Sequence, residues 1–213
     1  MQKSFVKRER VLKNVKKKIF DDFLPQYEIK SKDINILLSQ LSYQNVPVIL
    51  EIGFGNGENL FFLAKSYPKQ FFLGIEVYKP GIAHLLSLLK ICPLDNIKIC
   101  YNDATHVLEK YTTNLIFDKI LILFPDPWPK HRHHKRRLIQ ESFVEILYKK
   151  LKLNGIIHIA TDNEDYCTHS QKIFSKNVNF IPESKLYRLI KTKFERRGIK
   201  NGNIIFDTLW RKI

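Results

Sequence analysis

The amino-acid sequence predicts an α/β fold, with one mostly parallel sheet that is covered by helices on both faces. From about residue 48, short runs of β-branched and aromatic residues alternate with segments of helix length. These runs are almost continuously apolar, as is typical of strands buried on both sides. A length of 213 residues suits a single domain with a sizeable core and is rather short for two domains.

The expected elements follow one another in strand–helix order. The predicted strands are 48–52, 71–76, 97–102, 118–124 and 156–161, and helix-length segments lie around 58–67, 80–91, 104–111, 136–151 and 164–175. The run 203–212 predicts a closing strand. Before the first strand, Val11, Val15, Ile19 and Phe23 recur at helical spacing among many lysines and arginines, which predicts a basic amphipathic helix. We therefore expect one domain over 1–213, with a basic N-terminal segment (1–45) and a core (46–213) that ends in a second basic segment.

The charge balance limits the classes of partner. The chain has 36 Lys and Arg against 21 Asp and Glu, a formal net charge of +15. Such a field attracts polyanions such as RNA, DNA or anionic membranes, although a generally basic, solvated surface is the alternative. Cys92, Cys100 and Cys167 have no CxxC or metal-ligand spacing, which favours reduced thiols. With no signal peptide and no apolar run of about 20 residues, a cytoplasmic protein without membrane association is expected.

A glycine-rich turn, "LEIGFGNGENL" (50–60), follows the first predicted strand and opens the first helix of the core. Gly53, Gly55 and Gly57 let the backbone turn sharply and approach a ligand closely. Their G-x-G-x-G spacing differs from the dinucleotide-binding G-x-G-x-x-G, and no G-x-x-x-x-G-K-[ST] phosphate loop is present. Glu51, directly before the turn, would repel a pyrophosphate and attract an ammonium group.

Three more acids follow the next strands, where ligands bind in open α/β sheets. Glu76 is placed to accept hydrogen bonds from both ribose hydroxyls, and Asp103 from an adenine amino group. Asp126 ends the fourth strand between two prolines that restrict its backbone. With the turn, this set fits S-adenosylmethionine, which has an amino acid, a ribose and an adenine but no phosphate. The alternatives are a purely structural glycine turn, and Asp126 as a local backbone acceptor.

A basic run, "KHRHHKRR" (130–137), begins two residues after Trp128 and holds five Lys or Arg and three His residues. Zinc binding is disfavoured because the spacing is wrong and the cations would repel a metal. Contact with nucleic-acid phosphate is the better interpretation, and a solvated loop is the alternative. Trp128 could stack on a base or pack within the protein.

Several stretches of the chain are shared with a known family: "SFVKRE", "LEIGFGNGE", "FLGIEVYKPGI", "NDA", "FPDPWPKHRHHKRR", "ATDNEDY" and "TKFERRG". Over nearly its whole length the chain resembles the bacterial tRNA (guanine-N7-)-methyltransferases of the TrmB type. The resemblance implies a Rossmann-like class I fold with a seven-stranded sheet, S-adenosylmethionine as methyl donor, and tRNA as substrate. The implied target is N7 of guanine 46 in the tRNA variable loop.

The resemblance also implies roles for individual residues. Donor-binding positions fall on Glu51, Glu76, Asp103 and Asp126, and Asp126 is also the implied catalytic residue. Substrate positions fall on Lys130, Asp162, Thr192, Lys193, Phe194 and Glu195, and the RNA-contacting loop on His131, Arg132, His133, His134, Lys135 and Arg136. His131 stands where a second Lys is usual and His134 where Asn is common, which lowers the charge of this loop at neutral pH.

Guanine N7 has a lone pair and no proton, so its methylation needs alignment more than a base. We therefore hypothesise that Asp126 positions the guanine and stabilises charge without acting as a general base, and that Asp126, Asp162 or Glu195 selects guanine through its N1–H and amino group. The alternatives are an RNA methyltransferase that acts on an amino nitrogen, and a non-catalytic RNA-binding protein. We expect no metal and no obligate protein partner.

Overall fold

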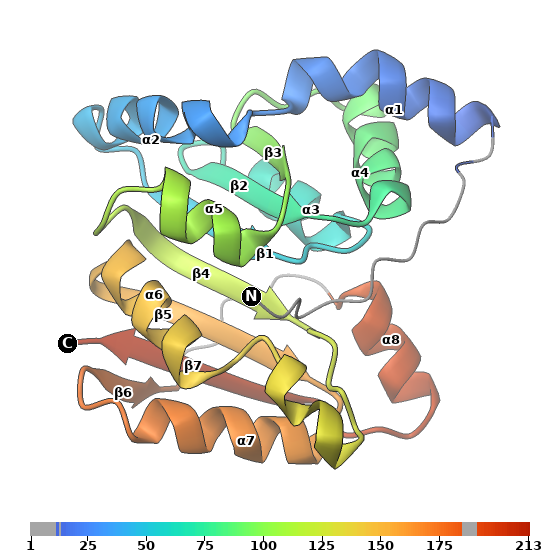
Figure 1. Ribbon diagram of the computed structural model, residues 1–213. Coiled ribbons are helices and arrows are strands. Elements are labelled where there is room, and N and C mark those ends of the chain that lie inside the picture. Colours follow the sequence, from blue (N-terminus) through green and yellow to red (C-terminus); the bar gives the residue numbers. More distant parts are fainter. Residues whose placement is uncertain (1–11, 13, 185–190) are drawn as a thin grey trace.

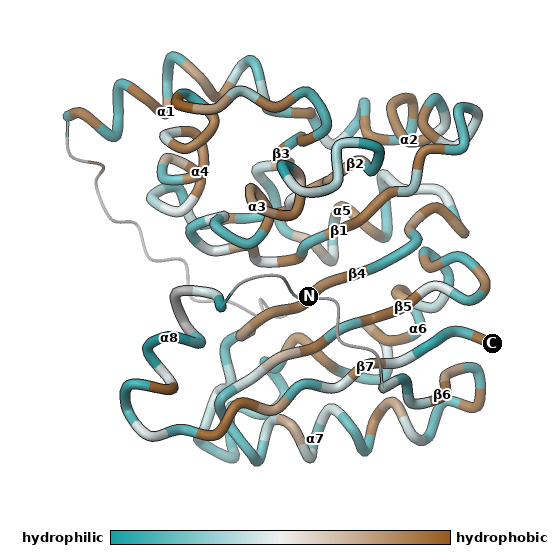
Figure 2. Tube along the Cα trace, turned by 180° about the vertical axis from the view of Figure 1, so that it is seen from behind, coloured by the Kyte–Doolittle hydropathy of each residue, from teal (hydrophilic) through white to brown (hydrophobic). Residues whose placement is uncertain are grey.

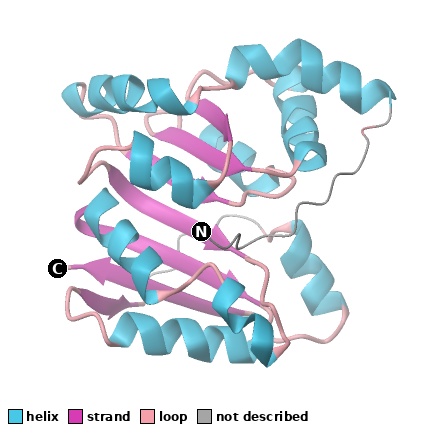
Figure 3. Ribbon diagram, viewed as in Figure 1, coloured by secondary structure: helices cyan, strands magenta, loops and turns pink. Residues whose placement is uncertain are grey.

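The computed structural model describes residues 12, 14–184 and 191–213, which form one open sheet between two layers of helices (Figure 1, Figure 3). The "SFVKRE" stretch, Val11 and the first residues of the second basic cluster (185–190) lie outside the described residues. None of the helices in the described part of the chain has the length and apolarity that crossing a membrane requires.

The sheet has seven strands in the order β3-β2-β1-β4-β5-β7-β6. The neighbours from β3 to β5 are parallel, and β7 runs antiparallel to both β5 and β6. The chain moves outward from β1 to β3 and then returns to place β4 beside β1, so the carboxyl ends of β1 and β4 form the point where ligands bind in such sheets. The strands are β1 (Val48–Ile52), β2 (Phe71–Glu76), β3 (Ile97–Tyr101), β4 (Phe117–Leu123), β5 (Leu151–Thr161), β6 (Phe180–Glu183) and β7 (Phe206–Lys212).

Two buried apolar clusters separate the helices into layers. One face of the sheet packs against α1 (Asn14–Tyr27), α3 (Glu58–Ser66) and α4 (Lys79–Ile91). The other packs against α2 (Ile34–Tyr43), α5 (Ala104–Tyr111), α6 (Glu141–Lys150) and α7 (Glu164–Ser175). Figure 2 shows the hydrophobic colouring concentrated in the central strands, while α8 (Lys193–Lys200) is mostly hydrophilic. Two short 3-10 helices, η1 (Ser31–Asp33) and η2 (His131–Arg136), complete the described elements.

The predicted strands and most of the predicted helices are present, and the structure differs from the prediction in some bounds and in some additional elements. The helix expected over 136–151 begins only at Glu141, because Arg137 and Gln140 have extended backbone. The strand expected at 156 begins at Leu151 and so includes a polar, partly exposed start. The sequence did not predict α2 or α8, nor β6, which is only four residues long and contains a proline. The closing strand is β7, which begins at Phe206.

The N-terminal helix is present as α1, and its buried face matches the predicted one only in part. Val15 is 74% exposed, whereas Phe20, Leu24 and Tyr27 are buried, with Ile19 and Phe23 packed beside them. The aromatic side chains cover more apolar surface than valine, and they decide which side of α1 faces α4 and β3. The N-terminal basic segment is therefore joined to the core by apolar contacts, which include Leu12 as well as Ile19 and Phe23.

Candidate active site

The glycine-rich turn lies at the carboxyl end of β1 and leads into α3. Gly53, Gly55 and Gly57 have φ values of +69°, +58° and +73°, a region that other residues seldom adopt. A Cβ atom at Gly57 would also lie 2.7 Å from Leu85 Cβ of α4. At Gly53 a Cβ would meet nothing within 4 Å, so the turn is open to a ligand at this point. The backbone of the turn is therefore specified by glycine and is accessible where β1 ends.

Glu76, the last residue of β2, holds this turn from the neighbouring strand. Its Oε2 accepts from Gly55 N at 2.7 Å, and its Oε1 accepts from Val77 N at 2.7 Å and Tyr78 N at 2.9 Å. A carboxylate offers about four acceptor positions, so about one remains for a ligand. The sequence predicted an acceptor for both ribose hydroxyls, and the geometry adds a second task, that of bracing the glycine turn. Burial raises the pKa of Glu76, and the three hydrogen bonds oppose this effect by lowering it. The negative charge of Asp126 makes a smaller contribution that also raises the pKa.

Glu51 faces the same end of the sheet from β1 and is only 2% exposed. Asn59 Nδ2 donates to its Oε2 at 3.0 Å, while Asn59 Oδ1 is buried without a hydrogen-bond partner. Burial is the main cause that raises the pKa of Glu51 to about 8. An ammonium group would neutralise the carboxylate and satisfy the orphaned amide oxygen together. The residues present thus fit the amino-acid end of S-adenosylmethionine.

Asp103 lies at the third strand end and is fixed by local hydrogen bonds. Its Oδ1 accepts from His106 N at 2.9 Å, which caps the start of α5, and its own N–H donates to Asn102 Oδ1 at 2.8 Å. It therefore stands at the predicted strand end with a defined orientation.

Asp126 lies on an exposed turn after β4, between two residues with unusual backbone. Phe124 has φ of +55° and Trp128 has φ of +44°, a strained region for aromatic residues. Phe124 N donates to Ala160 O at 2.7 Å, which ties the start of the turn to β5. Two prolines fix φ on either side of Asp126. The carboxylate of Asp126 thus follows β4 on a turn with a restricted backbone, and its charge makes the smallest of the contributions that shift the pKa of Glu76 upwards.

The basic loop continues from this turn into η2 and presents most of its cations to solvent. Lys130, His131, Arg132 and Lys135 are exposed, as a phosphate-binding surface requires. Trp128 packs against this loop, with His133 edge-on at 5.7 Å and the Arg136 guanidinium at 5.1 Å from its ring centroid. Trp128 was predicted either to stack on a base or to pack within the protein, and these contacts correspond to packing. Partial desolvation, and then the surrounding arginines and lysines, lower the pKa of His133.

The segment Thr192–Glu195, for which the resemblance implies a substrate role, forms the start of α8. Thr192 Oγ1 accepts from Glu195 N at 3.1 Å and Glu195 Oε2 accepts from Thr192 N at 3.3 Å, so the two residues form a buried capping box. The backbone of Lys193 and Phe194 begins the helix, and their side chains lie outside the described part of the structure.

The same helix packs against Asp162, which follows β5. A Cβ at Gly198 would lie 3.1 Å from Asp162 Oδ2, so glycine permits this close approach. Asn203 Nδ2 donates to the same oxygen at 3.0 Å. Arg196 forms an ion pair with Glu58, the first residue of α3. Thus α8 is attached both to the end of β5 and to the glycine turn.

Comparisons with known proteins agree with this geometry. The sequence profile of a family described as "Putative methyltransferase" matches residues 45–208. A tRNA (guanine-N(7)-)-methyltransferase from Nitrosococcus oceani is 42% identical over 98% of this chain and 90% of its own length, and one from Nitrosomonas europaea is 39% identical over 99% and 96%. The chain belongs to the tRNA (guanine-N(7)-)-methyltransferase family. At the level of fold alone, a precorrin-6y C5,15-methyltransferase from Geobacter metallireducens matches with a TM-score of 0.55 and 15% identity, over 83% of this chain and 87% of that one.

In this tRNA (guanine-N(7)-)-methyltransferase family member, sequence reasoning missed several residues that organise the site. Asn59 and Glu58 follow the glycine turn, and Arg196 lies within "TKFERRG", but no spacing rule pairs them across the fold. Arg137 was counted with the cations of the basic run, yet its side chain is only 1% exposed. Its neighbours are surface cations, so nothing in the local sequence marks it as buried. Among the described residues, no His, Cys, Asp and Glu group of three or more could hold a metal ion.

Proposed function

We propose that this chain transfers the methyl group of S-adenosylmethionine to N7 of guanine 46 in the variable loop of tRNA. It does so in the cytoplasm and without an obligate protein partner. The observation that carries the proposal is the position of Asp126. It lies on a strained turn that follows β4, at the same end of the sheet as Glu76, and shortly before the exposed cations of η2. The three free cysteines suit a reducing compartment.

The donor-binding residues hold three chemically different parts of one molecule. Glu51 and Asn59 suit the ammonium group, the remaining acceptor position of Glu76 suits a ribose hydroxyl, and Asp103 suits the adenine amino group. When bound, S-adenosylmethionine supplies a methyl group on a positively charged sulfur. The open turn at Gly53 lets the backbone lie against it without a side chain between them.

The acceptor needs orientation by carboxylates. Guanine N7 has no proton to lose, so Asp126 is not required as a base. Its carboxylate can accept hydrogen bonds from the base and stabilise the positive charge that develops on the purine. Asp162 is half-buried and accessible, whereas Glu195 is buried and serves the capping box. Asp126 and Asp162 are therefore the residues that select guanine through its N1–H and amino group, and orientation of this kind can lower a barrier by several kcal/mol.

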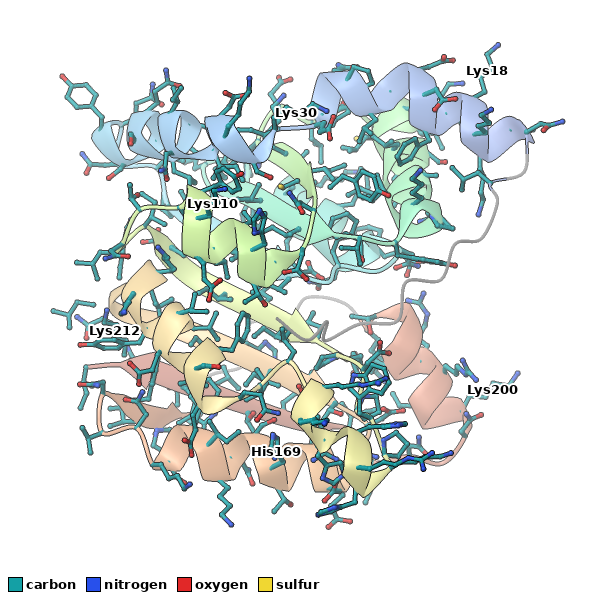
Figure 4. The ribbon with its side chains drawn as sticks, in the orientation of Figure 1. Lys18, Lys30, Lys110, His169, Lys200 and Lys212 are labelled. Atoms are coloured by element: carbon teal, nitrogen blue, oxygen red, sulfur yellow. The ribbon has the colours of Figure 1, made fainter. Side chains whose placement is uncertain are left out.

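The exposed cations hold the RNA around this point. The exposed cations of the basic loop include Lys130, Arg132 and Lys135, and those of α8 include Arg197 and Lys200. Figure 4 shows η2 and α8, with Lys200 labelled, on the same side of the molecule. Contacts to phosphates on both sides of the target nucleotide would position it and offset the few kcal/mol needed to unstack its base.

The decisive experiment incubates the protein with unmodified tRNA and methyl-labelled S-adenosylmethionine, followed by chemical cleavage specific to N7-methylguanine. We expect label in the tRNA and cleavage at position 46. A tRNA with adenine at position 46 is the matched control and should take up no label. Label without cleavage would instead indicate methylation of an amino nitrogen. Donor binding without any label would indicate a non-catalytic RNA-binding protein.

A further inference from the structure

Arg137 has the largest side chain among the fully buried residues of the described chain. Its Nε donates to Pro127 O at 3.0 Å, and one terminal nitrogen donates to Asp165 Oδ2 of α7. The same nitrogen lies 2.9 Å from His134 Nε2, and the guanidinium lies 5.4 Å from the centroid of the Tyr166 ring. A residue at the end of the basic run is thus bonded to the residue directly after Asp126.

These bonds close the loop between Pro127 and Arg137 and attach it to α7. Two further contacts act beside them. Tyr166 OH accepts from Ile139 N at 3.3 Å, and His169 Nε2 lies 2.9 Å from Ile139 O. The hydrogen bond from Arg137 also holds the pKa of Asp165 below its usual value. The segment that follows Asp126 is therefore fixed to α7 through Arg137.

The turn itself needs such support, because it is strained on both sides of Asp126. An aromatic residue at positive φ persists only where the surrounding structure holds it there. Phe124 is held by its bond to Ala160 of β5. On the other side, Trp128 follows Pro127, whose carbonyl is held by Arg137.

We propose that Arg137 is a positioning residue for methyl transfer, which fixes the Pro125–Trp128 turn and the Asp126 carboxylate and does not bind tRNA phosphate. This inference rests on the proposed function. It assigns Arg137 a different role from the exposed cations of the same basic run, which contact RNA.

The chemistry of the side chain suits this task. Only a guanidinium presents donors in a fixed planar fork that can reach a carbonyl, a carboxylate and an imidazole at once. Because arginine can only donate, His134 Nε2 must be the acceptor in this contact. Asp165 is 65% exposed, so it remains solvated when Arg137 is removed. A lysine at position 137 would keep the charge but could not make these contacts together.

The experiment compares Arg137→Lys with Arg132→Ala, which removes an exposed cation of the same loop. Two quantities are measured on tRNA: the single-turnover rate at saturating donor and tRNA, and the slope of log affinity against log salt. For Arg137→Lys we expect the rate to fall by about 100-fold, since small misplacements cost this much, with an unchanged slope. For Arg132→Ala we expect a slope smaller by about one, since this variant removes a cation that the proposed function assigns to the phosphates.

Asp165→Asn is the second variant, because it weakens the same contact with less risk to folding. It should also lower the saturated rate and leave the salt slope unchanged. The proposal is overturned if Arg137→Lys lowers the slope and keeps the rate, or if Asp165→Asn keeps the rate of the wild type. Calorimetric titration with S-adenosylmethionine should give wild-type affinity for both variants. If the wild type itself fails to methylate tRNA, the proposed function fails and not this inference.

Discussion

Glu51 shows how a side chain suited to a ligand can destabilise the free protein. Burial raises its pKa from 4.5 to about 8, so the folded chain keeps a proton that the unfolded chain has already lost between these values. The folded state then binds more protons than the unfolded state, and the free energy of unfolding decreases as pH rises. The contribution of this residue is at most about 1.4 kcal/mol per pH unit. Stability is therefore lost through the window from pH 4.5 to about 8.

Glu51→Gln should reverse this effect. The amide oxygen can still accept from Asn59, but the side chain has no charge to desolvate. We expect the variant without ligand to be more stable than the wild type by a few kcal/mol at pH 8, with the difference shrinking towards pH 4.5. Chemical denaturation at several pH values measures this difference. Since burial also raises the pKa of Glu76 in both proteins, only the difference between them is informative.

The same variant should bind S-adenosylmethionine more weakly, because the ammonium group loses its carboxylate. Calorimetric titration at pH 8 measures the affinity. For the stability prediction, the contradicting result is the same pH dependence of the free energy of unfolding in the wild type and in Glu51→Gln. That result would show that burial does not shift the pKa of Glu51.

Single residues differ in how far the sequence predicts them. The positions of Glu51, Glu76, Asp103 and Asp126 at strand ends could be predicted because the carboxyl end of a parallel strand is visible in the sequence as the end of an apolar run. Arg137 could not be found in this way, because its burial depends on Asp165 and Tyr166, which follow about 30 positions later on another element. Local sequence describes a cation but not the partners that neutralise it.

Among the elements, α8 contacts both the end of β5, at Asp162, and the start of α3, at Glu58. Its first turn carries Thr192 and Glu195, and its Arg196 pairs with Glu58 at the start of α3. The Arg196 side chain is about half exposed, and such pairs are worth at most about 1 kcal/mol. The pair can therefore bias the position of α8 towards the glycine turn without locking it.

Removing this pair should slow methylation by about twofold to fivefold, the range that an exposed ion pair allows. We expect Arg196→Ala and Glu58→Gln to lower kcat/KM for tRNA by similar factors, and the double variant to be no slower than either single variant. Arg197→Ala, which removes the next exposed cation of α8, is the control and should be additive with Glu58→Gln. If Glu58→Gln alone had no effect, Arg196 would act only through the RNA.

The elements that the sequence failed to predict are those defined by tertiary contacts. The apolar period predicts α3, α4, α5 and α7 closely, because each buries a continuous stripe. The residues before α6 satisfy helical propensity, but the bonds of Arg137 hold them extended. In the same way α8 is set by its capping box and by its contact with Asp162, because its sequence is mostly polar and its described side chains form no buried apolar stripe.

At the scale of the whole molecule, some basic residues of the described chain are buried, while others gather on the surface around η2 and α8. Lys150 and Lys212 are buried at the amino ends of the strands, where they donate to carbonyls that include Thr112 O and Leu151 O. Lys212 and Lys200 lie on opposite sides in Figure 4, and blue nitrogen atoms gather around η2 and α8. Part of the net charge of +15 is therefore buried and does not contribute to the surface. The exposed positive charge is concentrated near Asp126 and is not spread evenly over the surface.

This distribution predicts that affinity for tRNA falls steeply with salt, and that the fall depends on one end of the molecule. Each phosphate contact adds about 0.7 to 0.9 to the slope of log affinity against log salt. Lys135→Ala removes an exposed cation of the basic loop and should lower the slope by about one. Lys69→Ala removes an exposed cation from the turn before β2, at the opposite end, and should leave the slope unchanged. Filter binding of tRNA from about 50 to 200 mM salt measures both slopes. Equal losses for the two variants would mean that tRNA responds to the net charge of the protein and not to a surface around Asp126.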